Sequence, residues 1–107
     1  MNGFHLRLYT YESRKHGGVP VHDWLLDRAR RLGIPGGSAF RAIAGFGRSG
    51  RLHEQHFFEL AGEEPILVEF VASREQAQQL LELLAAEKLE LFYAMLPTEY
   101  GVVGEAS

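Results

Sequence analysis

Apolar and polar positions follow regular periods along most of the chain, and these periods predict its elements. In residues 4–11 they alternate, with Leu6 and Leu8 on one face and Arg7 and Tyr9 on the other, as in a half-buried strand. Elsewhere apolar residues recur at the i, i+3, i+4 spacing of a helix. The expected order is a strand at 4–11, a helix from Pro20 to Leu32, a strand that begins near 38 and breaks at 45, extended residues at 53–60, a strand at 66–71, a helix that follows Ser73, and a last strand at 89–96.

Residues with special backbone preferences mark the ends of these elements. Pro20 suits the first position of a helix, where its missing N–H leaves no bond unmade. Gly33, followed by Ile-Pro, is a typical helix stop. Ser73 and Gln76 have the spacing of a capping box, and Pro97 is expected to end the last strand.

The resulting order, β-α-β-β-α-β, predicts an α+β fold of the ferredoxin-like kind. In this sandwich two right-handed crossovers place both helices on one face of a four-stranded antiparallel sheet. The 107 residues suit a single domain, 1–107, with a core at about 4–97 and a flexible C-terminal tail at 98–107.

The sheet face away from the helices is expected to be too apolar for a monomer. The residues assigned to it are Tyr9, Ile43, Leu67, Val71, Phe92 and Leu96, mixed with the charged residues Arg7, Arg41, Glu69 and Glu90. An apolar patch of this size is normally covered, and the charges can pair across strands. We therefore expect an oligomer assembled through its sheets.

Composition narrows the classes of function. A formal net charge of −3 argues against general affinity for nucleic acid or acidic membranes, so any anion site must be local. The absence of cysteine excludes disulfides and thiolate metal sites. No stretch is apolar enough to span a membrane, the N-terminus lacks a signal-peptide layout, and we expect a cytoplasmic protein with no membrane insertion.

The strongest candidate site is the glycine- and arginine-rich segment 45–51. Three glycines in six residues break the strand here, and successive amides in such a bend can hold an anion. Arginines on either side of the last glycine add charge-assisted donors. A flexible hairpin with solvated arginines is the alternative. The candidate ligand-binding residues are Gly45, Gly47, Arg48, Ser49 and Arg51.

Arg14 and Lys15, in the polar loop after the first strand, form a second candidate of the same chemistry. Other classes find less support. His53 and His56 would point to opposite faces of a strand, and no metal site is expected. No serine or carboxylate pair has an evident catalytic partner, and the Gly-Phe-Gly at 45–47 ends the second strand, whereas an RNA-recognition motif has its signature on the third.

With these elements in place, the sequence resembles the PII-like proteins, and more closely the bacterial family catalogued as domain of unknown function 190. The resemblance covers about residues 4–96. It rests on Leu6-Arg-Leu-Tyr-Thr-Tyr-Glu-Ser13, Gly17-Gly-Val-Pro20, Ala29-Arg30, Gly33, Arg41-Ala-Ile-Ala-Gly-Phe-Gly47, Ser49-Gly-Arg51, His53 and Pro65-Ile-Leu-Val-Glu-Phe-Val71.

This resemblance implies a homotrimer with inward-facing sheets that binds a small anionic effector, such as an adenine nucleotide, between subunits. It implies a regulator of a partner protein or transporter rather than an enzyme, with Gly45, Gly47 and Arg48 as effector contacts. The chain lacks the glycine-lysine-rich loop and the C-terminal arginines of PII proper. A scaffold trimer without a ligand and an enzyme of ferredoxin-like fold therefore stay open as alternatives.

Overall fold

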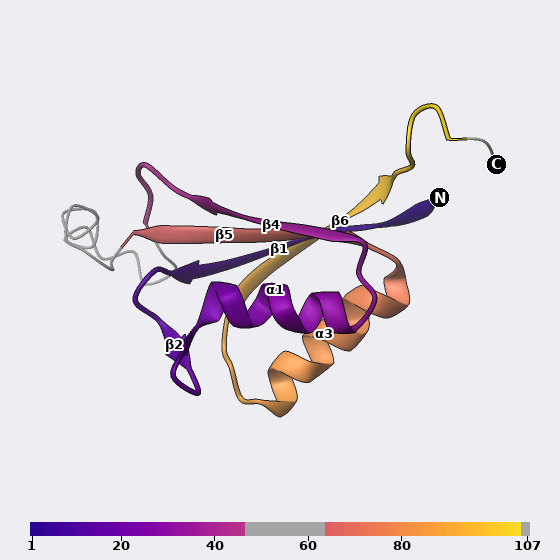
Figure 1. Ribbon diagram of the computed structural model, residues 1–107. Coiled ribbons are helices and arrows are strands. Elements are labelled where there is room, and N and C mark those ends of the chain that lie inside the picture. The colour runs from indigo at the N-terminus through magenta and orange to yellow at the C-terminus, as the bar shows by residue number, and fades with distance from the viewer. Residues whose placement is uncertain (47–63, 106–107) are drawn as a thin grey trace.

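A four-stranded antiparallel sheet carries two helices on one of its faces in the computed structural model, which describes residues 1–46 and 64–105 (Figure 1). The strands lie in the order β4-β5-β1-β6, and β2 and β3 form a separate short hairpin. This arrangement confirms the predicted fold. The elements are β1 (Asn2–Tyr11), β2 (Lys15–His16), β3 (Val19–Pro20), α1 (Val21–Arg31), β4 (Gly36–Arg41), β5 (Pro65–Ala72), α3 (Arg74–Ala86) and β6 (Phe92–Glu99).

The hydrophobic core lies between the sheet and the two helices. Leu6 and Leu8 of β1, Val68 of β5, Leu25 of α1 and Leu80 of α3 are all completely buried there. Complete burial of a side chain of this size contributes about 1.5–3 kcal/mol. The alternation in β1 and the helical periods therefore predicted the correct core faces.

The hairpin and the start of α1 differ from the sequence prediction. The predicted polar loop contains β2 and β3, joined through Gly17 and Gly18, which have φ angles of 60° and 81°. Positive φ at both central residues is the requirement of the tight turn that joins twisted strands. Because Pro20 pairs with Lys15 in this hairpin, it precedes the helix, which begins at Val21.

The remaining helix ends are as predicted. The Ser73 hydroxyl accepts a hydrogen bond from the Gln76 amide at 3.1 Å, and the Gln76 side chain accepts one from the Ser73 amide at 3.0 Å. This capping box begins α3. Gly33, with a φ angle of 83°, ends α1, and its carbonyl accepts a hydrogen bond from the Gln76 side chain at 2.9 Å. This hydrogen bond links the C-terminal end of α1 to the N-terminal end of α3.

The register of β4 is the main error of the sequence prediction. Phe40 pairs with Leu67 and lies on the open face of the sheet, whereas Arg41 pairs with Ile66. Arg41 therefore does not lie on the open face, and Ile43 lies beyond the end of the strand, fully exposed. The prediction failed because β4 is an edge strand in which all six residues are exposed, so burial imposes no alternation on its sequence.

Gly37 has a steric role in this register that can be tested. A Cβ atom added to it would lie 2.4 Å from the Phe70 ring, which is buried beneath it, whereas one added to Gly36 would meet nothing within 4 Å. We expect Gly37→Ala to lower the free energy of unfolding by about 1–3 kcal/mol, the usual cost of overpacking. Urea unfolding measures this, with Gly36→Ala as the matched control. Equal stability of the two variants would contradict the register.

The end of the chain is more ordered than the sequence suggested. Pro97 does not end the last strand, because β6 is an edge strand and continues to Glu99. The Tyr100 amide donates to the Met1 carbonyl at 2.9 Å, and the Met1 ammonium donates to the Tyr100 carbonyl at 2.8 Å. The predicted tail at 98–107 therefore begins only after Tyr100.

Candidate functional site

The structure describes three of the seven predicted site residues. Gly45 follows β4, and Arg14 and Lys15 lie at the hairpin of β2 and β3. The other four, Gly47, Arg48, Ser49 and Arg51, lie outside the described residues.

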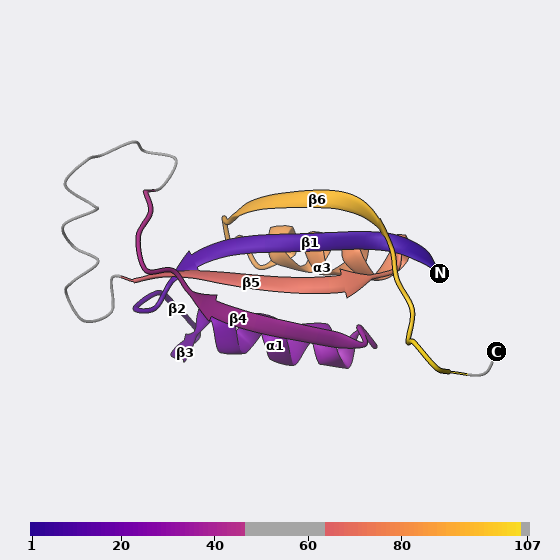
Figure 2. The same ribbon diagram turned by 90° about the horizontal axis from the view of Figure 1, so that it is seen from above.

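The described members gather at one end of the sheet, where the chain leaves β4 and returns into β5 (Figure 2). The antiparallel register places the end of β1, the end of β4 and the start of β5 side by side. A hydrogen bond of 2.9 Å from the Ala42 amide to the Pro65 carbonyl continues the pairing of β4 with β5 past Arg41. The residues on both sides of segment 47–63 are thus held at this end, which we call the loop end of the sheet.

An ion pair between Glu12 and Arg41 crosses the loop end. The Arg41 guanidinium donates to the Glu12 carboxylate. Arg41 is the last residue of β4 and Glu12 directly follows β1, so this bond reaches across β5, which lies between the two strands. The Glu12 amide also donates to the Glu64 carbonyl at 3.0 Å. Sequence reasoning missed this pair, because it assigned Arg41 to the open sheet face and Glu12 to a solvated loop.

The ion pair shifts the pKa values of both groups. The hydrogen bond from Arg41, followed by one with the Glu64 carboxyl group, lowers the pKa of Glu12 below its ordinary value of 4.5. The same bond raises the pKa of Arg41. Because the pKa of Glu12 is lower in the folded state, its contribution to stability is present above pH 4.5 and is lost as pH falls through the lowered pKa.

The hairpin that carries Arg14 and Lys15 is fixed to both helices. His16 contacts the Glu87 carboxylate at 2.9 Å, and its ring lies edge-on to Trp24, with the ring centroids 5.1 Å apart. Among the described residues, neither Arg14 nor Lys15 forms an ion pair. These two cations are therefore held near the loop end and remain open to a ligand.

The open face of the sheet is largely apolar, as predicted. Tyr9 and Phe92 are in ring contact, with centroids 5.7 Å apart, and Phe40 next to Leu67 extends the patch to the edge strand. Half of the surface of Phe40 is exposed, as is nearly half of that of Leu96. With the corrected register, the apolar residues of this face are Tyr9, Phe40, Leu67, Val71, Phe92, Ala94 and Leu96.

A polar group lies in the middle of this apolar face. Glu69 contacts His5 at 2.9 Å and lies 3.7 Å from the Nε atom of Arg7. The predicted pairing of charges across strands is confirmed for Arg7 and Glu69, whereas Glu90 precedes β6 and is not part of the sheet. The charges of this face are thus balanced locally, which makes its burial against another protein surface less costly.

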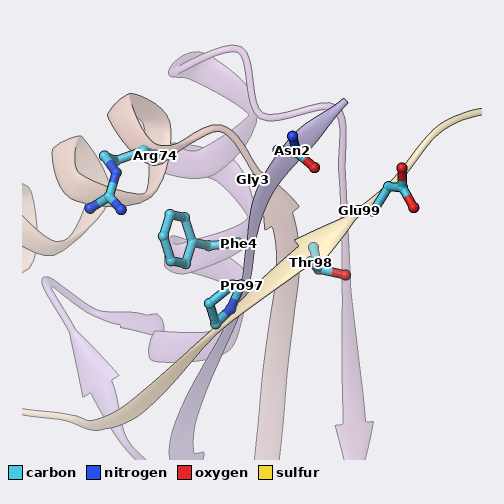
Figure 3. A pocket seen from close by; sticks show the side chains of 7 residues that line it. All are labelled: Asn2, Gly3, Phe4, Arg74, Pro97, Thr98 and Glu99. Atoms are coloured by element: carbon cyan, nitrogen blue, oxygen red, sulfur yellow. The ribbon is translucent and has the colours of Figure 1, made fainter.

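The opposite end of the sheet has a cleft that the sequence did not predict (Figure 3). Its volume is about 460 Å³, and its lining includes Phe4, Pro97 and Arg74. The Arg74 guanidinium stacks on the Phe4 ring at 4.7 Å from the ring centroid. The cleft lies at the strand ends opposite to Glu12 and Arg41, so it is separate from the predicted site.

Neither a metal-binding cluster nor a membrane-spanning helix is found in the described part of the chain. In residues 1–46 and 64–105 no three His, Asp or Glu side chains are grouped so that they could hold a metal ion. Neither of the two described helices has the length and apolar character needed to cross a membrane.

Comparison with solved structures places this fold among PII-like proteins. A PII-like signalling protein from Thermus thermophilus superimposes with a TM-score of 0.62, at 16% sequence identity over 91% of this chain and 87% of that one. CPII from Thiomonas intermedia, a nitrogen regulatory PII-like protein solved with ADP, AMP and bicarbonate, also gives a TM-score of 0.62. Its identity is 19%, over 94% of this chain and 97% of its own. At these identities the likeness establishes the fold.

Sequence comparison establishes the family. The UPF0166 protein of Aquifex aeolicus (strain VF5) is 32% identical over an alignment of 96 residues, with 82% of this chain and 91% of the relative covered. The family DUF190, described as Uncharacterized ACR, matches residues 3–93. Since this match spans three strands of the sheet, the start of β6 and both helices, the chain belongs to the DUF190 family and shares the fold of the PII-like signalling proteins.

Proposed function

We propose that this protein is a non-catalytic, PII-like regulator that binds a small anionic effector at the loop end of the sheet. The effector lies between subunits of a homotrimer, and the bound state is passed to a partner protein or transporter in the cytoplasm. The observation that carries the proposal is that Arg41 and the hairpin with Arg14 and Lys15 lie at the same end of the sheet, where the chain leaves β4 and returns into β5.

Electrostatics support an anion over a neutral ligand. The chain as a whole is negative, so cations concentrated at one end of the sheet are a local feature rather than a general property. Arginine presents planar donors that match the oxygens of a carboxylate or a phosphate. Adenine nucleotides and bicarbonate are the first probes to test, because CPII was solved with ADP, AMP and bicarbonate.

The apolar open face supports assembly through the sheets. Aromatic and aliphatic side chains cover it on all four strands. Exposed patches of this kind mark interaction surfaces in soluble proteins. In the proposed trimer the three open faces turn inward, and each loop end lies next to a neighbouring subunit.

A scaffold trimer without a small ligand is the second candidate. It is favoured by one observation, namely that Glu12 already neutralises Arg41 in the protein alone. In this case the loop end is a structural contact, and the open face is the functional surface.

A thermal-shift panel separates the two candidates. ADP, AMP, ATP, bicarbonate and inorganic phosphate are each added to the purified protein, with sodium chloride at matched ionic strength as the control. For a regulator we expect at least one probe to raise the melting temperature in a saturable manner. If no probe acts beyond the salt control, the effector hypothesis is wrong and the scaffold interpretation is preferred.

A further inference from the structure

The protein supplies its own anion to Arg41. The guanidinium at the end of β4 bonds the Glu12 carboxylate, which follows β1 and reaches it across the start of β5. A carboxylate is also one of the anions that an arginine in a ligand site would be expected to bind. Glu12 therefore occupies the position that an external anion would take on this face of Arg41.

The charges around Arg41 imply that the bound Glu12 carboxylate opposes the binding of an external anion. Among the described residues, Arg41 has two carboxyl groups around it, those of Glu12 and Glu64. An external anion at Arg41 would meet the Glu12 carboxylate, and like charges at contact distance repel each other. Binding at Arg41 thus requires that Glu12 give up its place.

The geometry allows this exchange without disturbing the sheet. The Glu12 side chain is about one-third exposed and that of Arg41 more than half exposed, so both can rotate into solvent. The Glu12 backbone stays in place independently, because its amide donates to the Glu64 carbonyl at 3.0 Å. Release of the side chain therefore breaks its bonds to Arg41 and to the Glu64 carboxyl group and leaves the backbone pairing in place.

We infer that Glu12 is a specificity-determining residue of the effector site proposed above, an internal competitor that the effector must displace from Arg41. The inference rests on that proposed function. A site with this internal competitor selects oxyanions that can present two oxygens to a guanidinium together, namely carboxylates, bicarbonate and phosphates. Halides lack the paired oxygens that match the planar guanidinium.

Isothermal titration calorimetry on four proteins tests the inference: the parent, Glu12→Gln, Arg41→Ala and the double variant. Each is titrated with ADP, with bicarbonate and with inorganic phosphate, so that the affinity for phosphate groups and the affinity for a carboxylate-like anion are measured separately. We expect Glu12→Gln to tighten binding by about two- to fivefold, since it removes one exposed ion pair that the ligand must break. We expect Arg41→Ala to weaken it by about tenfold or more, since it removes a charge-assisted hydrogen bond.

The double variant decides between competition and general electrostatics. If Glu12 acts through Arg41, Glu12→Gln has no effect once Arg41 is alanine, because coupled residues are not additive. Glu82→Gln is the matched control. It removes one exposed carboxylate from α3 and leaves both Arg41 and the hairpin untouched, so its affinity should equal that of the parent.

Each remaining outcome has a distinct meaning. Equal affinities of the parent and Glu12→Gln, with binding intact, overturn the competitor role and leave the effector site standing. A gain that persists in the Arg41→Ala background overturns it as well, since the effect is then one of charge alone. Failure of all probes to bind any of the four proteins rejects the effector site itself.

Discussion

Leu67→Lys is expected to separate the assembled protein into monomers or to leave it insoluble. Leu67 lies on the open face, between Phe40 of β4 and Tyr9 of β1. If three such faces pack together, the lysine ammonium is buried without a partner, which costs about 3–5 kcal/mol for each subunit. Light scattering coupled to gel filtration measures the change in mass.

A charge added to the helix side provides the control. Gln78 is exposed on α3, so Gln78→Lys adds the same charge without reaching the open face and should leave the mass unchanged. A parent protein that is monomeric at micromolar concentration would show that the apolar face does not mediate assembly. The same conclusion would follow if Leu67→Lys kept the mass of the parent.

The second large effect concerns the arginines of the segment between β4 and β5. We expect an effector at about one hundred times its dissociation constant to add about 2.7 kcal/mol to native stability. For a domain of this size that is a rise in melting temperature on the order of 10 °C. The double change Arg48→Ala, Arg51→Ala should abolish this rise, because it removes the charged donors that the sequence assigns to the anion.

The melting temperature without effector should hardly change in this double variant, since arginines without a buried partner contribute little to folding. Arg30→Ala, Arg31→Ala is the matched control, because it removes two exposed arginines from the last turn of α1. This control should keep the full effector response. If the Arg48, Arg51 variant is still stabilised as the parent is, the anion lies elsewhere, and Arg14 and Lys15 are the next residues to change.

The sequence alone determined those features that depend on neighbours along the chain. The alternation of Leu6 and Leu8 with Arg7 defined the buried face of β1, because successive side chains of a strand point to opposite sides. The capping box of Ser73 and Gln76 defined the start of α3, because both partners lie within one helical turn. These local signals sufficed for the fold.

The sequence also indicated part of the site. A glycine-rich break after a strand predicts that the strand ends there, and β4 does end before Gly45. The two arginines that follow lie outside the described residues, so their part in the site stays a prediction. The hairpin at Arg14 and Lys15 could be named as a second cationic loop. Neither pattern reveals which cation already has a partner.

The tertiary structure decided the features that depend on residues far apart in sequence. The Phe70 ring of β5 can lie beneath β4 only because Gly37 has no Cβ atom, and this contact favours the register in which Phe40 and not Arg41 faces the open side. Pro97 continues β6 because that strand lies at the sheet edge, where a missing amide need not leave a bond unmade. The periodic pattern of the sequence predicts neither the packing of Gly37 against Phe70 nor the edge position of β6.

The pair of Glu12 and Arg41 shows the same limit at the candidate site. The two residues are 29 positions apart and belong to strands that are not neighbours in the sheet. Their contact depends on the strand order and on the register of β4, and a shift of one residue would send Arg41 to the open face. The arginine itself is visible in the sequence, but its partner, and with it the chemistry at the loop end, follows only from how the strands are ordered and paired.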